Sequence, residues 1–139
     1  SKVNKGVVYM EKNLSEHSEK SVRFFDLMME GLKDHVDAET FWDAVDENAV
    51  FKFNYYFPNL PKEMGKLKYK EWLEENTNSG SSAEFINLYK DLSTPGQTTI
   101  IMQYVVRFKP GIPDMNFLSI ATVKDNKVVA WDDYLDTSK

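Results

Sequence analysis

The segment "VVAWDDYLD", residues 128–136, sets the fold class and poses the main question about function. Side chains of a β-strand alternate between two faces, so one face of this strand carries Val129, Trp131, Asp133 and Leu135. Three of these four side chains are apolar, which predicts that their face is buried. A carboxylate on a buried face needs a partner or a purpose, so Asp133 is the first candidate functional residue.

The chain before this segment also shows strand patterns. Four consecutive strands are expected at 83–92, 97–109, 116–124 and 127–135, because turn sequences ("STPG", "KPGIPD" and "KDN") separate them. An earlier strand is predicted at 49–57, "AVFKFNYYF", where the segment is rich in aromatic residues and one face carries Ala49, Phe51, Phe53, Tyr55 and Phe57. The four last strands follow one another closely enough to pair as an antiparallel meander.

The first part of the chain has helical spacing instead. Apolar residues recur every three or four positions over 22–36, and Asn13 followed by Glu16 matches a capping box at the start of such a helix. Gly31 is expected to weaken the last turns of this helix.

Two further helices are expected before the run of strands. The second has Asp37 as its N-cap and carries Phe41, Trp42 and Val45, and "DEN" ends it. The third covers about 66–77, after the loop "PNLPKEMG".

Helices that precede a run of strands indicate an α+β fold. We expect one curved, mixed but mostly antiparallel sheet with three helices over its concave face. The whole chain, 1–139, is expected to be a single domain, in which 1–12 forms either an extra strand or a loose arm.

Composition narrows the classes of partner. A net charge of −5 argues against nucleic acid, and no apolar run has the length of a membrane span or the pattern of a signal peptide. The chain has no cysteine, and its two histidines, His17 and His35, are not spaced as a ligand pair. Asp132 and Asp136 share the strand face opposite Asp133, so the three cannot converge on one ion. We expect a cytoplasmic domain without metal or cofactor.

Two segments carry a resemblance to a known group of proteins. "FWDAVDENAVFKF" (41–53) leads from the second helix into a strand, and the closing "VVAWDDYLD" is similar to the Trp-x-Asp-Tyr-x-Asp ending of SnoaL-like proteins and limonene epoxide hydrolase. With the element order, they resemble the superfamily of ketosteroid isomerases, nuclear transport factor 2-like proteins and SnoaL-like polyketide cyclases, over about 17–136. The resemblance implies an α+β cone around an apolar pocket, with Asp133 at the position of a pocket aspartate.

The sequence also departs from this group. The arginine and second aspartate of the epoxide hydrolases would fall at 102–104, where no residue can perform those roles. Their water-holding tyrosine and asparagine, and the base of the isomerases, would fall near Phe51 and Phe53, while Asn54 points to the opposite face. Epoxide hydrolysis and steroid isomerisation by the known machinery are therefore disfavoured.

Asp133 has two interpretations. In an apolar pocket, burial would raise its pKa and suit it to act as a general base. Alternatively, it is a structural aspartate held by backbone amides or an arginine. Tyr55 and Tyr104 are either donors to a substrate oxygen or packed rings. The pocket wall is predicted to comprise Phe53, Tyr55, Trp72, Met102, Tyr104 and Trp131.

Three functional hypotheses remain open. The first is a cyclase- or isomerase-like enzyme that removes a proton next to a carbonyl of a small hydrophobic compound, with Asp133 as base. The second is a non-catalytic binder of an apolar small molecule. The third is a dimeric association module that uses the outer sheet face with Ile101 and Val105. A homodimer is expected in each case.

Overall fold

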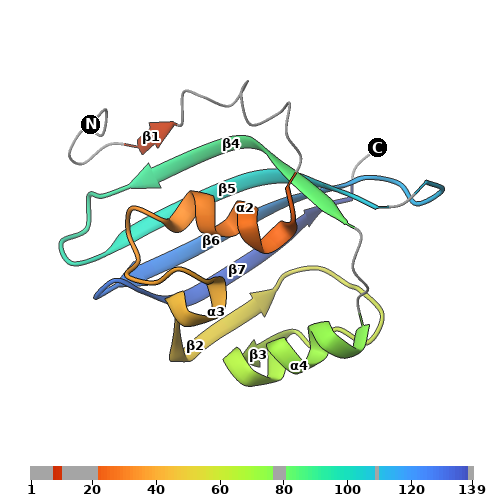
Figure 1. Cartoon of the computed structure of the whole chain (residues 1–139), viewed down its shortest axis with the longest axis horizontal. Coiled ribbons are helices and arrows are strands. Elements are labelled where there is room, and N and C mark those ends of the chain that lie inside the picture. The colour runs from red at the N-terminus through yellow and green to blue at the C-terminus, as the bar shows by residue number, and fades with distance from the viewer. Residues whose placement is uncertain (1–7, 11–21, 77–80, 109, 138–139) are drawn as a thin grey trace.

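The computed structural model describes residues 8–10, 22–76, 81–108 and 110–137. In these residues, three helices accompany seven strands that form one sheet in the order β1-β4-β5-β6-β7-β2-β3 (Figure 1). The helices are α2 (Phe24–Leu32), α3 (Phe41–Ala44) and α4 (Lys66–Asn76). The strands are β1 (Val8–Met10), β2 (Val45–Phe53), β3 (Glu63–Gly65), β4 (Ser82–Asp91), β5 (Thr98–Arg107), β6 (Met115–Lys124) and β7 (Lys127–Asp136).

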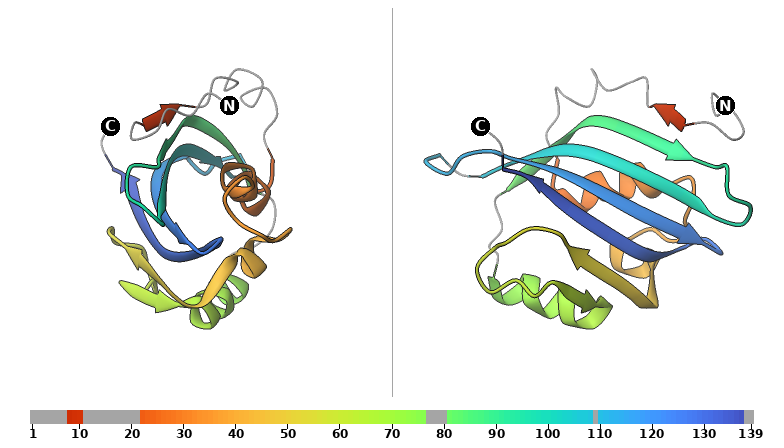
Figure 2. Two further views of the ribbon diagram at one scale, coloured as in Figure 1. Left: turned by 90° about the vertical axis from the view of Figure 1, so that its left-hand side faces the viewer. Right: turned by 180° about the vertical axis from the view of Figure 1, so that it is seen from behind.

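The sheet is mixed but mostly antiparallel, because only the β2–β7 pair is parallel. Strands β4 to β7 form the predicted antiparallel meander. In the left view of Figure 2 the sheet curls around the space in which α2 lies, and the helices cover its concave face. The predicted α+β fold class is confirmed. The parallel pair has a functional consequence, since it places Phe53 directly opposite Asp133.

The predicted alternation of the last strand is correct at its centre and wrong at its start. Trp131 is 2% exposed and Asp133 is 4% exposed, so both lie on the buried face. The register between β6 and β7 shifts before Ala130, and this irregularity turns Val128 into the core in place of the predicted Val129. A β-bulge inserts one residue into a strand, which reverses the alternation on one side of it.

The second helix is shorter than predicted. Its N-cap is Thr40, whose Oγ1 accepts a hydrogen bond from the backbone N–H of Asp43 at 3.3 Å, rather than Asp37. Val45 is already the first residue of β2, and 46–48 continue that strand instead of separating helix from strand. Three polar residues in a row resemble a loop, but here they lie at an irregular, largely exposed part of the strand.

Strand β2 also ends earlier than the predicted residue 57. The loop after it contains the short strand β3, which the sequence did not predict and which pairs antiparallel with 50–52. A strand of three residues is too short for alternation to identify. The third helix agrees with its prediction of 66–77 to within one residue. In the described part of the chain, no helix has the length and hydropathy needed to cross a bilayer.

The first helix packs against the sheet more closely than its sequence suggested. Gly31 is buried in α2, and a Cβ at this position would lie 3.0 Å from Met102 Sδ and 3.1 Å from Phe85 Cζ. The glycine therefore lets the helix approach the sheet. The predicted capping box at 13–16 lies outside the described residues. Within the segment 1–12, residues 8–10 form β1, which pairs with β4, and the other residues of that segment lie outside the described ones.

Candidate functional site

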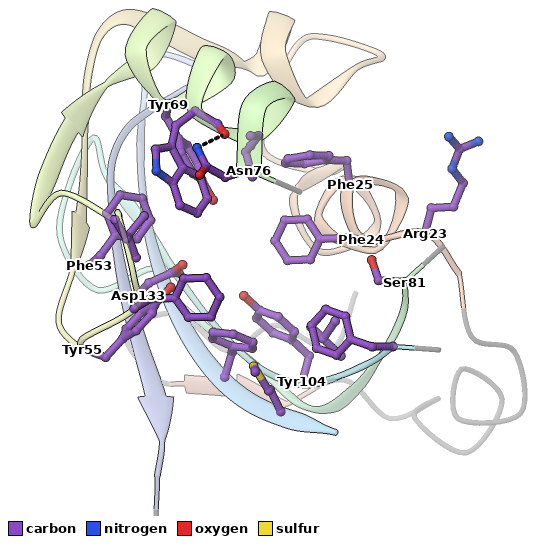
Figure 3. A pocket seen from close by; sticks show the side chains of 18 of the residues that line it. Arg23, Phe24, Phe25, Phe53, Tyr55, Tyr69, Asn76, Ser81, Tyr104 and Asp133 are labelled. Carbon is purple, nitrogen blue, oxygen red and sulfur yellow. Dashed lines mark hydrogen bonds between the residues drawn. The ribbon is translucent and has the colours of Figure 1, made fainter. Parts of the chain in front are cut away.

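A cavity of about 960 Å³ opens between the concave face of the sheet and helices α2 and α4 (Figure 3). Its volume lies in the range of small-molecule sites. Ten of its twenty lining residues are aromatic, and they come from both helices and several strands: Phe24, Phe25, Phe53, Tyr55, Phe57, Tyr69, Trp72, Tyr104, Phe108 and Phe117. The charged lining residues are Arg23, Asp26, Glu74 and Asp133.

Four of the six residues predicted to form the wall line this cavity, namely Phe53, Tyr55, Trp72 and Tyr104. The other two are corrected by the structure: Met102 and Trp131 lie in the solid core.

Both corrected residues are covered by the first two helices. Met102 is fully buried beneath Gly31, and the ring of Trp131 packs edge-on against Phe41 at 5.3 Å. Alternation gave the correct face for both side chains, but α2 and α3 fill this end of the concave face. The cavity begins two residues further along each strand, at Tyr104 on β5 and at Asp133 on β7.

Asp133 is fixed by two side-chain donors. Its Oδ1 accepts hydrogen bonds from Ser119 Oγ at 2.5 Å and from Trp131 Nε1 at 2.7 Å. Ser119 lies directly opposite on β6, whereas Trp131 lies two residues earlier on the same face of β7. The spacing "W-x-D" therefore has a direct structural use: the indole orients the carboxylate.

A third residue extends this network. Tyr104 Oη and Ser119 Oγ are 2.7 Å apart. The single hydroxyl hydrogen of Ser119 is donated to Asp133, and an ionised carboxylate can only accept. Tyr104 must therefore donate to Ser119, which gives a chain of hydrogen bonds from Tyr104 through Ser119 to Oδ1 of Asp133.

The second oxygen of Asp133 is in a different situation. No described residue makes a hydrogen bond or ion pair to Oδ2. Every buried side-chain nitrogen and oxygen of the described chain has a hydrogen-bond partner, so an oxygen without a partner is not buried. Oδ2 must therefore reach open space, and the open space beside Asp133 is the cavity that it lines. The carboxylate has one fixed oxygen and one available oxygen.

Burial raises the pKa of Asp133 from 3.8 to about 6. Desolvation is the largest cause, since the charged form loses contact with water. The hydrogen bonds from Ser119 and Trp131 act in the opposite direction because they stabilise the carboxylate, and the nearby charge of Asp132 raises the pKa slightly further. The carboxylate is thus mostly ionised at neutral pH, yet basic enough to accept a proton.

Two tyrosine hydroxyls are also available to the cavity. Tyr55 and Tyr69 line it, and no described residue makes a hydrogen bond to either hydroxyl, so by the same reasoning both oxygens reach open space. Burial and the negative charge of Asp133 raise the pKa of both hydroxyls. Tyr69 is the more deeply buried of the two. Both therefore stay protonated at neutral pH and act as hydrogen-bond donors.

Other polar residues near Asp133 do not join the site. Asn54 lies outside the cavity lining, as its position on the other strand face predicted, and its Nδ2 donates to the backbone carbonyl of Asp133 at 3.1 Å. Within the described residues, no group of three acidic, histidine or cysteine side chains could hold a metal ion. Asp132 and Asp136 lie on the opposite face of β7 from Asp133.

Sequence reasoning missed Ser119 and Tyr69. Ser119 stands inside the apolar strand pattern of "FLSIATV", and only the pairing of β6 with β7 reveals its partner. Tyr69 lies one turn before Trp72 in α4, at the spacing of a helical stripe, but the sequence gives no signal that its hydroxyl is functional. A polar residue at a predicted inward position is the signal that could have identified Ser119.

Comparison with solved structures identifies the fold. The chain is similar to a candidate isomerase from Bacillus subtilis, with 22% identity over 88% of this chain and 86% of the other, and a TM-score of 0.56. It is also similar to a nuclear transport factor 2-like protein from Anabaena variabilis, with 14% identity over 81% and 89%, and a TM-score of 0.52.

No protein-family model and no curated protein matches the sequence. The expected resemblance is confirmed at the level of fold: the chain has the cone fold of nuclear transport factor 2-like proteins.

Proposed function

We propose that this protein removes a proton from the carbon next to a carbonyl group of a small hydrophobic compound, as an isomerase or a cyclase does, with Asp133 as general base. The observation that carries this proposal is the unequal treatment of the two carboxylate oxygens. Oδ1 is fixed by Ser119 and Trp131, while Oδ2 reaches an aromatic cavity without a partner among the described residues.

The chemistry needs a base of suitable strength. A general base works best when its pKa lies near the working pH and it is still ionised there. With a pKa of about 6, Asp133 meets both requirements at neutral pH. Oδ2 would take the proton and Oδ1 would keep its two donors, so the base would not need to reorient during the reaction.

Removal of the proton leaves negative charge on the carbonyl oxygen of the substrate. The hydroxyls of Tyr55 and Tyr69 are available as donors in the cavity, and both lie close enough to Asp133 for its charge to raise their pKa. Donors aimed at a developing oxyanion in a site that excludes water lower the barrier strongly. In an isomerisation, the protonated Asp133 would then return its proton to another carbon. In a cyclisation, the carbanion would attack a second carbonyl carbon, the π electrons of that carbonyl would move to its oxygen, and the resulting alkoxide would take up the proton held by Asp133.

A second candidate is a non-catalytic binder of an apolar molecule in the same cavity. It is favoured by the composition of the lining, in which aromatic residues dominate and Asp133 is the single deeply buried charge. A binder would use the cavity in the same way but would need no ionised Asp133.

Deuterium exchange separates the two candidates without knowledge of the natural substrate. β-Tetralone, a compact bicyclic ketone, is incubated in heavy water with the protein, and loss of its α-proton signal is followed by NMR. The parent protein should accelerate exchange, and Asp133→Asn should lower the acceleration by about a hundredfold or more, while affinity for the ketone barely changes.

Tyr55→Phe is the second variant in the same assay. It leaves the base intact and removes a donor, so we expect a smaller loss of rate at unchanged affinity. Exchange that Asp133→Asn leaves undiminished would refute the proposed role of Asp133. Binding of the ketone without accelerated exchange would favour the binder.

A further inference from the structure

The charged side chains that line the cavity suggest a ligand of a different class from a neutral carbonyl compound. Among the charged lining residues, three are carboxylates and one is a guanidinium. The guanidinium belongs to Arg23, an exposed residue, and Figure 3 shows its side chain across the opening from Asp133 and directed away from it. Among the residues that the structure describes, the buried end of the cavity therefore carries negative charge only.

The carboxylate at that end is uncompensated. Asp133 is 4% exposed, and its partners in the described chain are two neutral donors, the hydroxyl of Ser119 and the indole of Trp131. Buried carboxylates are normally paired with a cation or bound to a metal, because burial of an isolated charge is costly. Its available oxygen, Oδ2, faces the cavity and no described residue brings a positive charge to it, so a bound molecule in that space could supply the counter-charge.

The surrounding walls would also favour a positive charge. Half of the lining residues are aromatic. The π-system of an aromatic ring is negative on its face, and cations placed over several rings are attracted to them, above all quaternary and tertiary ammonium groups that carry their own apolar substituents. Phe53 and Tyr55 flank Asp133, and Tyr69 packs on Phe53 at 5.0 Å.

We infer that the cavity binds lipophilic cations, namely quaternary or protonated amines with an apolar body, in preference to neutral molecules of the same shape, with the ammonium group placed against Oδ2 of Asp133. The inference goes beyond the proposed proton transfer. It uses the same carboxylate and needs that carboxylate to be ionised, but it requires no turnover. A bound ammonium group would hold Asp133 in its ionised form and block its access to a carbonyl substrate.

The test compares two probes that differ in one atom. Benzyltrimethylammonium carries a fixed positive charge, and neopentylbenzene has carbon in place of the nitrogen and the same shape. Affinities are measured by NMR titration at pH 7.5. We expect the cation to bind at least about tenfold more tightly, as cation–π attraction and a facing carboxylate together predict. Equal affinities, or tighter binding of the neutral probe, would overturn the inference.

Asp133→Asn assigns the preference to the buried carboxylate. The asparagine keeps the size of the side chain and an oxygen that can accept from Ser119 and Trp131, and unchanged affinity for neopentylbenzene shows that the cavity is intact. The variant should lose the preference for the cation. Asp132→Asn removes the neighbouring carboxylate on the outer face of the same strand, outside the cavity lining, so it is the matched control and should retain the preference. Retention of the preference by the Asn variant would overturn the assignment to Asp133.

A pH series gives an independent readout, because neither probe titrates. The ionisable groups of the lining are Asp133, Tyr55, Tyr69 and Tyr104, together with Arg23, Asp26 and Glu74 at the rim. As Asp133 takes up a proton, affinity for the cation should fall by about tenfold between pH 7.5 and pH 5, while the neutral probe is unaffected. The Asn variant should lack this dependence. A dependence that persists in the variant would overturn the inference. The deuterium-exchange assay tests the proposed proton transfer separately, because its outcome does not depend on whether the cavity prefers cations.

Discussion

Replacing Asp133 by asparagine should stabilise the protein at neutral pH, since the structure buries this carboxylate without a cation among the described residues. The pKa of Asp133 is about 6 in the folded chain against an ordinary value of 3.8. A group whose pKa is raised by folding favours its protonated form in the folded state. Stability is therefore greatest where the carboxyl is protonated, and it falls as the pH rises through the window between about 4 and 6.

The magnitude follows from the same two values. The ionised carboxylate costs the folded state about 3 kcal/mol at pH 7.5, and about 1 kcal/mol at pH 4.5, where it is mostly protonated. Asparagine resembles the protonated acid in shape and charge. The variant should therefore be about 3 kcal/mol more stable than the parent at pH 7.5, or about 10 °C higher in melting temperature, and the difference should shrink to about 1 kcal/mol at pH 4.5.

The assay is urea unfolding followed by circular dichroism at both pH values. Asp132→Asn is the matched control, because it removes the neighbouring carboxylate on the outer face of the same strand, and we expect a change within about 0.5 kcal/mol. A loss of stability in Asp133→Asn at pH 7.5 would refute the reasoning. It would mean that the charge-assisted hydrogen bonds from Ser119 and Trp131 outweigh the cost of burial, as expected for a purely structural aspartate.

Three further predictions concern other parts of the molecule. Ser119→Ala removes a hydrogen bond to the carboxylate that is worth about 1.5–3 kcal/mol, so it should raise the pKa of Asp133 by one unit or more. In the pH profile of deuterium exchange, the acid limb should then move to higher pH, and an unshifted limb would contradict the prediction. Gly31→Ala should cost about 1–3 kcal/mol in urea unfolding through contact with Met102, and an unchanged midpoint would show that the sulfur moves aside freely. We expect a homodimer through the outer sheet face, where Ile101 is partly exposed and Val105 is nearly buried. Light scattering at micromolar concentration should give the mass of a dimer, and Ile101→Asp should lower that mass. A monomer mass for the parent protein would refute the prediction.

The parts of the structure that the sequence predicted depend on local patterns. Alternation along β7 put Asp133 on the buried face, because adjacent residues of a strand point to opposite sides. The same rule failed at Val129, where a bulge that depends on the neighbouring strand changes the alternation. Very short elements such as β3 were also missed, since three residues carry no periodic signal.

The sequence could not show how far along the cone each inward-facing side chain lies. Alternation assigned Met102 and Tyr104 to the same face, but α2 packs over Met102 and leaves Tyr104 at the cavity, and the close approach at Gly31 decides this. The partner of Asp133 was equally hidden. Ser119 is 14 residues away along the chain, and the register of β6 against β7 alone brings the two side chains together.

If Asp133 is a weakly acidic group with one oxygen available for chemistry, the indole of Trp131, which donates to its other oxygen, should report the ionisation directly. The chain has three tryptophans, and Trp131 Nε1 is the indole nitrogen that donates to a carboxylate, whereas that of Trp72 donates to a backbone carbonyl. In protein labelled with nitrogen-15, the Trp131 Nε1–H resonance, assigned with Trp131→Phe, is followed against pH. We predict a titration with a midpoint near 6 that disappears in Asp133→Asn. A midpoint near or below 4, or a titration that persists in the variant, would contradict the account.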